Sequence, residues 1–233
     1  MSVPTPSVTS GDNLRTTLEE GCAKNRWMQK LGELDWQSFF PHVASPSRTP
    51  IEQQLYWKLL HRRLPVNAYL KTKGNFVPNR GCVVCGEQVE TIEHVFFECP
   101  NVQTFWKTFR IYMIKFLQMT EAELPEFTLR DTIFFFPELC KTLVPEELHV
   151  LTVCHSVALW AIWSMRSSAN ADVLLWPCFL SRLEARVFLE YENICKNGNI
   201  SADKESINTF ASRWCNDKSL VKLTTDGIIF SSS

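Results

Sequence analysis

The sequence predicts a mainly α-helical protein with one small cysteine-rich segment embedded in it and a small β-hairpin at its C-terminal end. Three observations lead to this prediction. Apolar residues recur at spacings of three and four along most of the 233 residues, which is the period of an amphipathic helix. Three cysteines and one histidine cluster in residues 82–99. Asp226 and Gly227 separate two short apolar pieces near the C-terminus, which is a hairpin signal.

The composition is that of a folded protein, because 45% of the residues are hydrophobic and 12% are aromatic. The formal net charge of -1 gives no overall positive field for nucleic acid or membranes, so any such binding requires a local patch. The nine cysteines are odd in number and unevenly spaced, and residues 1–17 lack the apolar stretch of a secretory signal. We therefore expect an intracellular protein with buried thiols and no disulfide framework.

In the first half of the chain, a leader is followed by helices whose ends are marked by proline and glycine. A loose apolar stripe predicts the first helix at residues 12–30. A second helix starts at Ile51 and ends or kinks at Pro65, and a third runs from Pro65 to Gly74. A further helix follows the cysteine-rich segment at residues 100–118, with aromatic residues along one side.

The second half of the chain is also predicted to be helical. Its longest apolar stretch, Val150–Met165, has about 16 residues against roughly 20 for a membrane span, and it contains polar residues such as His155. We therefore predict a helix buried in the core and no association with a membrane. Two more helices are expected at residues 176–198 and 200–214, the second of them capped by Ser201.

The cysteine and histidine cluster has the spacing of a metal site, C-x2-C-x8-H-x4-C. Its first pair sits on a tight turn, which Gly86 permits, so that two thiolates can reach one ion. Its second pair lies in a stretch that should be helical, and Cys99 stands where a new helix begins at Pro100, whose dipole favours a thiolate. Three thiolates and one imidazole satisfy tetrahedral Zn²⁺ without an open position, so the sequence predicts a structural zinc finger. The predicted ligands are Cys82, Cys85, His94 and Cys99.

Other interpretations of this cluster fit less well. One alternative is that the four residues bind no metal and occur together only because the chain is rich in cysteine. Cysteines of that kind are expected in the core, whereas Cys82 and Cys85 lie on a polar turn. A zinc deaminase needs its histidine motif before the C-x2-C pair, whereas here the pair comes first. Within the cluster, Thr91 is a candidate helix cap, and Glu90 or Glu93 is a candidate hydrogen-bond partner of His94.

Outside the predicted metal site, the sequence shows no group of residues arranged for catalysis. A cysteine hydrolase pairs a thiolate with a histidine, but the adjacent Cys154 and His155 point in different directions on a helix and are interpreted as core residues. His42 and His149 show no partner. We therefore expect that the chain is not an enzyme.

The stretch from Gln54 to Arg166, about half of the chain, resembles the reverse-transcriptase zinc-binding domain. In that family a tryptophan-containing helix and a Leu-Pro step precede the C-x2-C pair, and a segment like "EtieHlffeCp" and a further tryptophan follow it. A later family helix, "lWaiWkaRN", is similar to "ALWAIWSMRSSAN" here, where Ser167 stands in place of the usual Asn. The matching residues are Trp57, Leu64, Pro65, Cys82, Cys85, Glu90, His94, Phe97, Cys99, Pro100, Trp106, Trp160, Trp163 and Arg166.

This resemblance implies a structural zinc ion and a place downstream of the polymerase in non-LTR (LINE-type) retrotransposon polyproteins. The chain has no Asp-Asp pair, which a reverse transcriptase needs to hold two metal ions. It therefore looks like a detached carboxyl-terminal fragment that lacks the polymerase, and the family suggests a nuclear rather than a cytoplasmic location. We divide it into a leader and helix (1–50), a reverse-transcriptase-type zinc-binding module (51–120) and a helical region (121–233).

Local charge suggests a function for the module, because residues 53–86 contain no Asp or Glu. Folded back by zinc, their basic side chains would form one surface that binds RNA or DNA with little sequence preference. Tyr69 and Phe76 would stack on bases beside it. The alternative is an ordinary solvated helix face. The predicted nucleic-acid-binding residues are Lys58, Arg62, Arg63, Lys71, Lys73 and Arg80.

Two other roles stay open from the sequence. Eight tryptophans and 16 phenylalanines are an unusually large aromatic share, so the C-terminal half also suggests a protein-interaction or scaffold domain in which zinc only stabilises the fold. The sequence is also compatible with a translated retroelement remnant that has no selected function. Basic residues that converge beside the metal favour nucleic-acid binding, and basic residues scattered over the surface favour the scaffold role.

Overall fold

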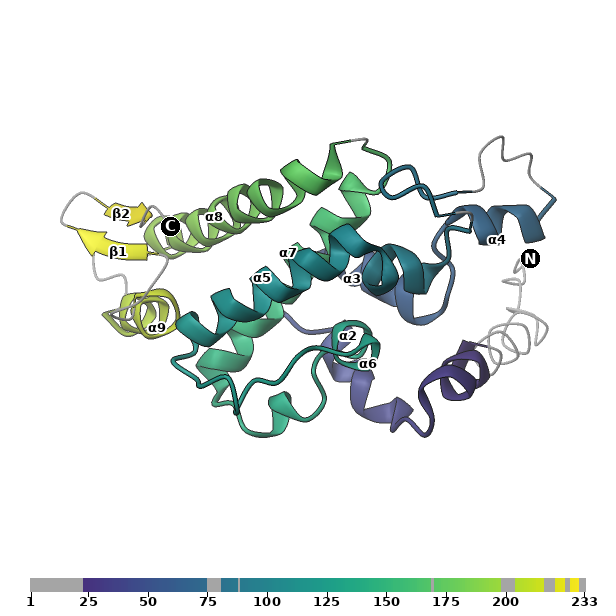
Figure 1. Cartoon of the computed structure of the whole chain (residues 1–233). Helices are drawn as coiled ribbons and strands as arrows, with labels where there is room; N and C mark the ends of the chain where they lie inside the picture. The colour runs from purple at the N-terminus through teal and green to yellow at the C-terminus, as the bar shows by residue number, and fades with distance from the viewer. Residues whose placement is uncertain are drawn as a thin grey trace, which may run out of the picture.

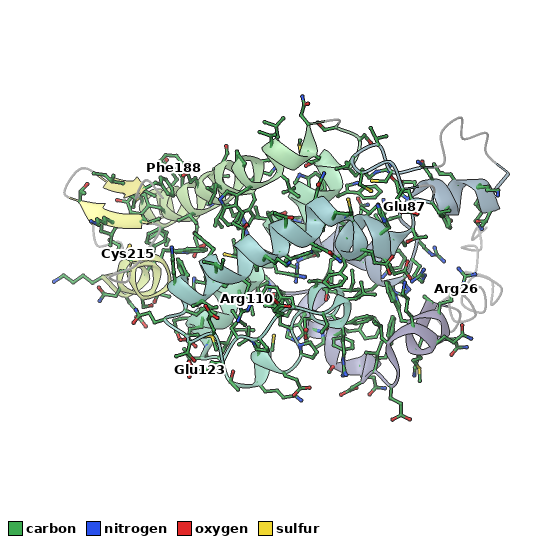
Figure 2. The ribbon with its side chains drawn as sticks, viewed as in Figure 1. Arg26, Glu87, Arg110, Glu123, Phe188 and Cys215 are labelled. Atoms are coloured by element: carbon green, nitrogen blue, oxygen red, sulfur yellow. The ribbon has the colours of Figure 1, made fainter. Side chains whose placement is uncertain are left out.

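The computed structural model describes residues 23–74, 81–87, 89–168, 170–197, 204–215, 221–224 and 227–230. Three long helices form its centre, α5 (Pro100–Phe116), α7 (Pro145–Met165) and α8 (Ala171–Asn197) (Figure 1). The helix α8 packs against both of the others, and side chains fill the space between the three (Figure 2). The protein is therefore mainly α-helical, as the sequence predicted.

Shorter elements surround these helices. At one end of the molecule, α9 (Lys204–Trp214) lies beside an antiparallel hairpin of β1 (Val221–Thr224) and β2 (Gly227–Phe230), and at the other end lies α4 (Asn67–Thr72) (Figure 1). The remaining elements are a helical stretch at residues 23–31, two 3-10 helices, η1 (Trp36–Phe39) and η3 (Leu139–Lys141), a π-helix, η2 (His94–Glu98), and the helices α2 (Phe40–Val43), α3 (Pro50–Leu60) and α6 (Leu129–Ile133).

The predicted C-terminal hairpin is confirmed, with Val221 opposite Phe230 and Thr224 opposite Gly227. None of the described cysteines forms a disulfide, which agrees with the expected absence of a disulfide framework. Three parts of the prediction lie outside the described residues, namely residues 12–22 of the first helix, the cap Ser201 and Asp226 of the hairpin turn.

The helix α3 begins at a capping box rather than at the predicted Ile51. The Thr49 hydroxyl accepts a hydrogen bond from the Glu52 N–H (3.4 Å), and the Glu52 carboxylate accepts one from the Thr49 N–H (2.7 Å). The helix ends at Leu60 instead of running up to the next proline. The reason is the backbone of Arg62, whose φ of 54° lies in the left-handed region and cannot continue a right-handed helix.

One hydrophobic core joins the three segments into which we divided the sequence. Trp27 of the first segment, Leu59 of the second and Phe179 of the third are all fully buried members of it. The indole N–H of Trp27 also donates to the carbonyl of Leu60 at 2.8 Å. The segments therefore share one core, and the metal-binding part is built into the helical body.

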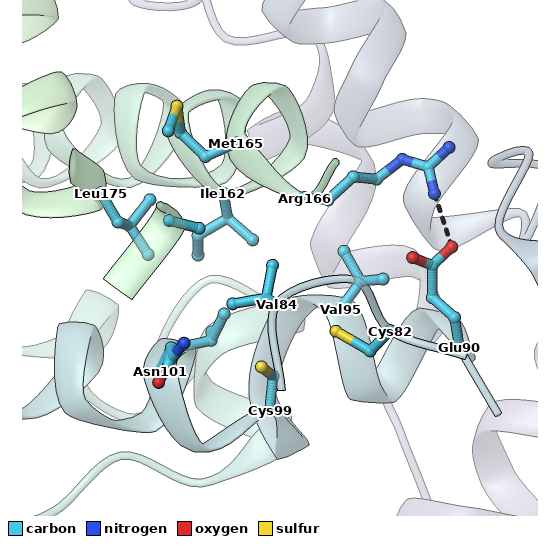
Figure 3. Close-up of a pocket in the computed structure, with 12 residues that line it drawn as sticks. Cys82, Val84, Glu90, Val95, Cys99, Asn101, Ile162, Met165, Arg166 and Leu175 are labelled. Atoms are coloured by element: carbon cyan, nitrogen blue, oxygen red, sulfur yellow. Dashed lines mark hydrogen bonds and ion pairs between the residues drawn. The ribbon is translucent and has the colours of Figure 1, made fainter. Parts of the chain in front are cut away.

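The C-terminal end of α7 packs against the cysteine-rich segment through Ile162, Met165 and Arg166 (Figure 3). By length and composition α7 is apolar enough to cross a membrane, but 67% of its most apolar window is buried inside the protein. Cys154 and His155 in its middle are fully buried, as predicted for core residues. The helix therefore serves as the central element of the core.

Arg48 is a charged residue that the core encloses, since it is 2% exposed. Its guanidinium donates to the His42 carbonyl (2.8 Å) and to the Ser156 hydroxyl (2.6 Å), and it lies 3.1 Å from His155 Nδ1 and 4.3 Å from the centre of the Tyr56 ring. Burial lowers the pKa of Arg48 to about 10, so the group stays charged at neutral pH. The arginine thereby ties the linker before α3 to the middle of α7.

Replacement of Arg48 with Met should lower the free energy of unfolding by about 3 kcal/mol, because a buried carbonyl and a buried hydroxyl lose their donor. Urea denaturation followed by circular dichroism measures the change. The matched control is Arg182→Met on the exposed face of α8, for which we expect a change within about 0.5 kcal/mol. Equal effects of the two substitutions would contradict a structural role for Arg48.

Candidate metal centre

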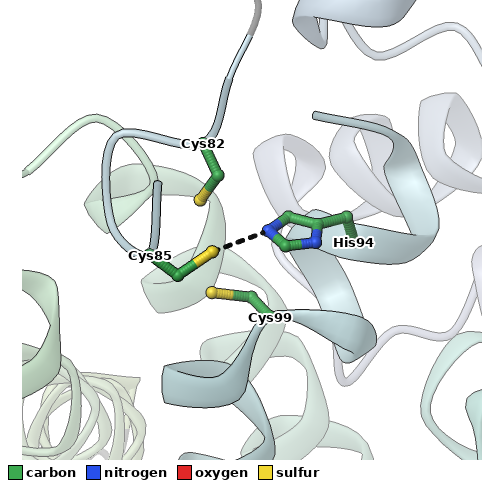
Figure 4. Close-up of side chains that lie close together, drawn as sticks. All are labelled: Cys82, Cys85, His94 and Cys99. Carbon is green, nitrogen blue, oxygen red and sulfur yellow. Dashed lines mark hydrogen bonds between the residues drawn. The ribbon is translucent and has the colours of Figure 1, made fainter. Parts of the chain in front are cut away.

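The four predicted ligands come together in space (Figure 4). Their sulfur and nitrogen atoms all lie within 4.8 Å of one another, and Cys85 Sγ is 3.3 Å from His94 Nε2. Around one zinc ion, with Zn–S bonds of 2.3 Å, two sulfurs would stand about 3.8 Å apart. A small inward movement of the side chains is enough to close a tetrahedral site, so the donor set fits one metal ion. Cys85 is the most exposed ligand, and the other three are buried.

A tight turn presents the first two ligands. The Gly86 N–H donates to the Cys82 carbonyl (2.9 Å), and the Cys82 N–H donates to the Glu87 carbonyl (2.8 Å). Gly86 has a φ of 79°, a left-handed conformation that glycine adopts without strain. As the sequence predicted, the glycine lets the chain turn back so that Cys85 faces Cys82.

A π-helix presents the other two ligands. Thr91 caps the stretch as predicted, because its hydroxyl accepts from the His94 N–H at 3.0 Å. The stretch is helical as predicted, and from His94 on it is a π-helix, η2, closed by a 2.9 Å hydrogen bond from the Cys99 N–H to the His94 carbonyl. In an α-helix, residues five apart point about 140° apart. The wider π-turn brings His94 and Cys99 to the same side, so the metal geometry prevails over the usual helix.

The thiols at this centre are harder to ionise than the sequence suggested. Burial raises the pKa of Cys99 to about 12, although the N–H groups of Asn101 and Val102 at the start of α5 act in the opposite direction. Burial also raises the pKa of Cys82. The N–H groups at the start of α5 therefore ease the ionisation of Cys99, as expected, but burial outweighs them, so a metal ion has to displace protons from these sulfurs.

Glu90 fastens the cysteine-rich segment to the end of α7. Its buried carboxylate accepts hydrogen bonds from Arg166 Nη1 (2.5 Å) and from the Asn67 N–H (3.1 Å) (Figure 3). Arg166 also lies 4.4 Å from the centre of the Trp163 ring, which is parallel to the Phe96 ring within 2°. The cavity left between the segment and α7 has a volume of only about 20 Å³, so the contact is closely packed.

Glu93 fastens the same segment to the end of α3. Its carboxylate is 2.6 Å from Arg62 Nη1 and 3.9 Å from Lys30 Nζ, and Arg62 in turn stacks 4.4 Å over the Trp27 ring. Burial alone would raise the pKa of Glu93, but the hydrogen bond and charge of Arg62, together with Lys30, hold it below its usual value. We considered both glutamates as partners of the histidine ligand, but the structure pairs each with an arginine. Arg62 is therefore not free to bind a phosphate.

The short helix α4 is fixed to the cysteine-rich segment by hydrogen bonds. The Asn67 side-chain amide donates to the Gly81 carbonyl (3.3 Å), and the Ala68 N–H donates to the Glu90 carbonyl (3.0 Å). These bonds add to the one between the Asn67 N–H and the Glu90 carboxylate. The metal segment thus determines where α4 lies, and with it the side chains that α4 presents.

The other predicted nucleic-acid-binding residues differ in exposure. Lys71 on α4 and Lys73 just after its end are exposed, whereas Lys58 on α3 and Arg63 just beyond it are half-buried. Lys73 lies 5.6 Å from the centre of the half-buried Tyr69 ring, so a basic and an aromatic group stand together as predicted. Two predicted residues lie outside the described part of the chain, Arg80 and Phe76.

The residues that position the centre could not be recognised from the sequence. Asn67 and Trp27 were given no role, and the partners of Glu90 and Glu93 were misassigned. One signal in the sequence pointed to the partner of Glu90. Arg166 lies in the later helix that resembles the family, and a partly buried arginine there needs an acidic partner. The spacing alone does not reveal a partner 76 residues away along the chain.

Comparison with known proteins gives one similarity. Residues 22–106 match the model of a protein family described as zinc-binding in reverse transcriptase. The match contains all four ligands, ends at Trp106 and covers a little over a third of the chain. It starts before the boundary we predicted at residue 51 and so takes in Trp27. Searches of curated proteins and of solved structures find no similar protein. This part of the chain is thus supported as a reverse-transcriptase-type zinc-binding domain.

Replacement of Cys85 with Ser should release the metal and loosen the segment, because metal affinity contributes directly to folding there. We expect metal content to fall from about one ion per chain to near zero and the Tm to fall by roughly 10 °C. Amide exchange should rise in residues 81–99. The control is Cys195→Ser, which changes an exposed cysteine on α8. Unchanged helical content and Tm in the Cys85 variant would contradict a structural metal.

Glu90 and Arg166 should show a coupling of about 1–3 kcal/mol in a double-mutant cycle of Glu90→Gln and Arg166→Met, because the carboxylate is buried. The free energy of unfolding of the four proteins gives the coupling. The exposed pair Glu138 and Lys141 serves as the control and should show little coupling. A coupling at the first pair no larger than at the control would show that it does not hold the segment.

Proposed function

We propose that this chain is a non-catalytic module that binds nucleic acid and that uses a structural zinc ion to fix its binding surface. A LINE-type retrotransposon origin without the polymerase, and a nuclear or cytoplasmic location, are parts of the same proposal. The family match supports zinc binding over residues 22–106. The later helix of the resemblance supports the origin, because its Trp163 and Arg166 contact the metal segment.

The metal has a structural role in this proposal because no ligand position is left for a substrate. Three sulfurs and one imidazole nitrogen complete tetrahedral zinc. The surroundings agree with such a role, since two buried acidic groups beside the ligands, Glu90 and Glu93, are both paired with arginines. Neither carboxylate is free to act as the general base that a catalytic zinc site uses.

The hydrogen bonding of α4 is the observation that carries the nucleic-acid part of the proposal. Because α4 is bonded to Gly81 and Glu90 of the metal segment, the metal fixes the exposed Lys71 and Lys73 beside it. Two fixed lysines next to the Tyr69 ring combine phosphate attraction with a stacking face. Such a surface binds the nucleic-acid backbone with little sequence preference.

A protein-interaction role is the second candidate, and α8 provides the observation in its favour. The outer side of this helix exposes four large apolar side chains, among them Phe188 (Figure 2). They form two pairs about 21 Å apart along the helix, and exposed apolar groups along one side of a helix favour a surface that binds a partner. The four residues, with their exposed fractions, are Val173 (69%), Leu174 (43%), Phe188 (46%) and Leu189 (54%).

The test is a salt titration of zinc-loaded protein against labelled single-stranded RNA and duplex DNA, read by fluorescence anisotropy. Binding should weaken steeply as salt rises. The double variant Lys71→Ala and Lys73→Ala should weaken binding roughly tenfold at low salt and reduce the slope of log K against log salt by about 1.5.

The matched control removes two exposed lysines from α5 instead, Lys107→Ala and Lys115→Ala. An equal loss in this control would mean that the lysines act only through net charge and not as a surface on α4. Absence of binding even at low salt would reject the nucleic-acid role and leave the exposed face of α8 as the basis for function.

A further inference from the structure

Ser47, His149 and Glu190 form a chain of hydrogen bonds near the N-terminal end of α7. Ser47 Oγ is 2.9 Å from His149 Nδ1, and His149 Nε2 is 3.1 Å from Glu190 Oε2. No partner of His149 is evident from the sequence, but the structure gives it two. They come from the linker before α3 and from α8, 102 and 41 residues away along the chain.

The partners of Glu190 decide which nitrogen of His149 carries the proton. Burial alone would raise the pKa of Glu190, but its hydrogen bonds and charge interactions with His149 and Arg213 lower it, so the group is a carboxylate at neutral pH. Its oxygens accept from Arg213 Nη1 (3.1 Å) and from the indole N–H of Trp214 (3.2 Å). A carboxylate facing Nε2 requires a proton on that nitrogen. In the neutral imidazole, Nδ1 is then the nitrogen without a proton, and it faces the hydroxyl of Ser47.

The serine and the histidine line a surface cleft with a volume of about 550 Å³, which is within the range of small-molecule sites. Arg213 lines the same cleft, whereas Glu190 is not among its lining residues. The order from the cleft inwards is therefore hydroxyl, imidazole and carboxylate. This is the arrangement by which a base, oriented by an acid, activates a serine nucleophile.

The hydrogen-bonded series Ser47–His149–Glu190, here called the relay, lies apart from the metal centre. His149 stands near the start of α7, and Met165, which packs beside the cysteine ligands, stands at its end. Sixteen residues of helix separate the two by about 24 Å. The relay therefore requires no participation of the metal.

We propose that Ser47 is an activated nucleophile that takes the acyl group from small carboxylic esters bound in this cleft. Ser47 Oγ attacks the ester carbonyl carbon, and its proton passes to His149 Nδ1. The bond from the carbonyl carbon to the leaving oxygen then breaks, and the leaving group departs with its electron pair and takes the proton from His149. The product is an ester of Ser47 and the free alcohol, and water releases the acid in a second attack.

Charge in the cleft supports this step. With a neutral imidazole, Arg213 and Glu190 balance each other's charge. When His149 accepts the proton, its positive charge pairs with Glu190, and Arg213 is left to balance the oxygen anion that forms at the substrate. The three protein charges and the anion then sum to zero, which favours the charged intermediate in a partly buried site. The proposal goes beyond the function argued above, in which the metal centre is non-catalytic, and adds an activity at a second site.

The test is the reaction of the full chain with p-nitrophenyl acetate, followed by release of p-nitrophenol and by peptide mapping of the acetylated residue. We expect a burst close to one p-nitrophenol per chain, with the acetyl group on Ser47. Ser47→Ala should abolish the burst, and His149→Gln should slow it at least 100-fold. Circular dichroism and Tm measurements establish that both variants remain folded.

The control is Ser212→Ala, because Ser212 is an exposed serine on α9 whose hydrogen bond is to a carbonyl within its own helix. Its burst should equal that of the unchanged protein. Acetylation of Ser47 no faster than of Ser212, or a burst that survives in a folded Ser47→Ala variant, would overturn the proposal. In that case the relay serves only to satisfy the partly buried carboxylate of Glu190.

Discussion

Four ligand atoms from two separate turns have to meet at one point, and the rest of this structure depends on that constraint. The turn after Cys82 requires glycine in a left-handed conformation, and the segment from His94 requires a π-helix in place of an α-helix. The π-helix is not the most stable choice for an isolated backbone. A metal ion that joined the two turns would supply the free energy that this local geometry costs.

Two glutamates connect the metal segment to the helices around it. Glu90 is bonded to Arg166 at the end of α7, and Glu93 is bonded to Arg62 just beyond α3. Each arginine is also stacked on a tryptophan, so its position is fixed from two sides. The metal segment is therefore held between α3 and α7 and in turn holds α4, which explains why one core serves the whole described chain.

The sequence predicted the parts of the structure that depend on local pattern. The helices, the C-terminal hairpin, the convergence of the four ligands and the cap at Thr91 all follow from spacing and from single residue types. The sequence could not predict contacts between distant residues, such as Arg166 with Glu90 or His149 with Ser47, because no local pattern encodes a partner. The end of α3 and the π-turn were also beyond prediction, since tertiary contacts and metal geometry override helix propensity there. The raised pKa of the Cys99 thiol was also not predictable from the sequence, because it depends on burial, which outweighs the influence of the helix N-terminus.

The central claim is that one closed metal site organises the described chain. X-ray absorption spectroscopy at the zinc edge, on protein purified with its native metal, tests it most directly. The account predicts one zinc ion with three sulfur neighbours at about 2.3 Å and one nitrogen neighbour at about 2.0 Å, with no bound water. A first shell with oxygen neighbours or fewer than three sulfurs would contradict a closed structural site.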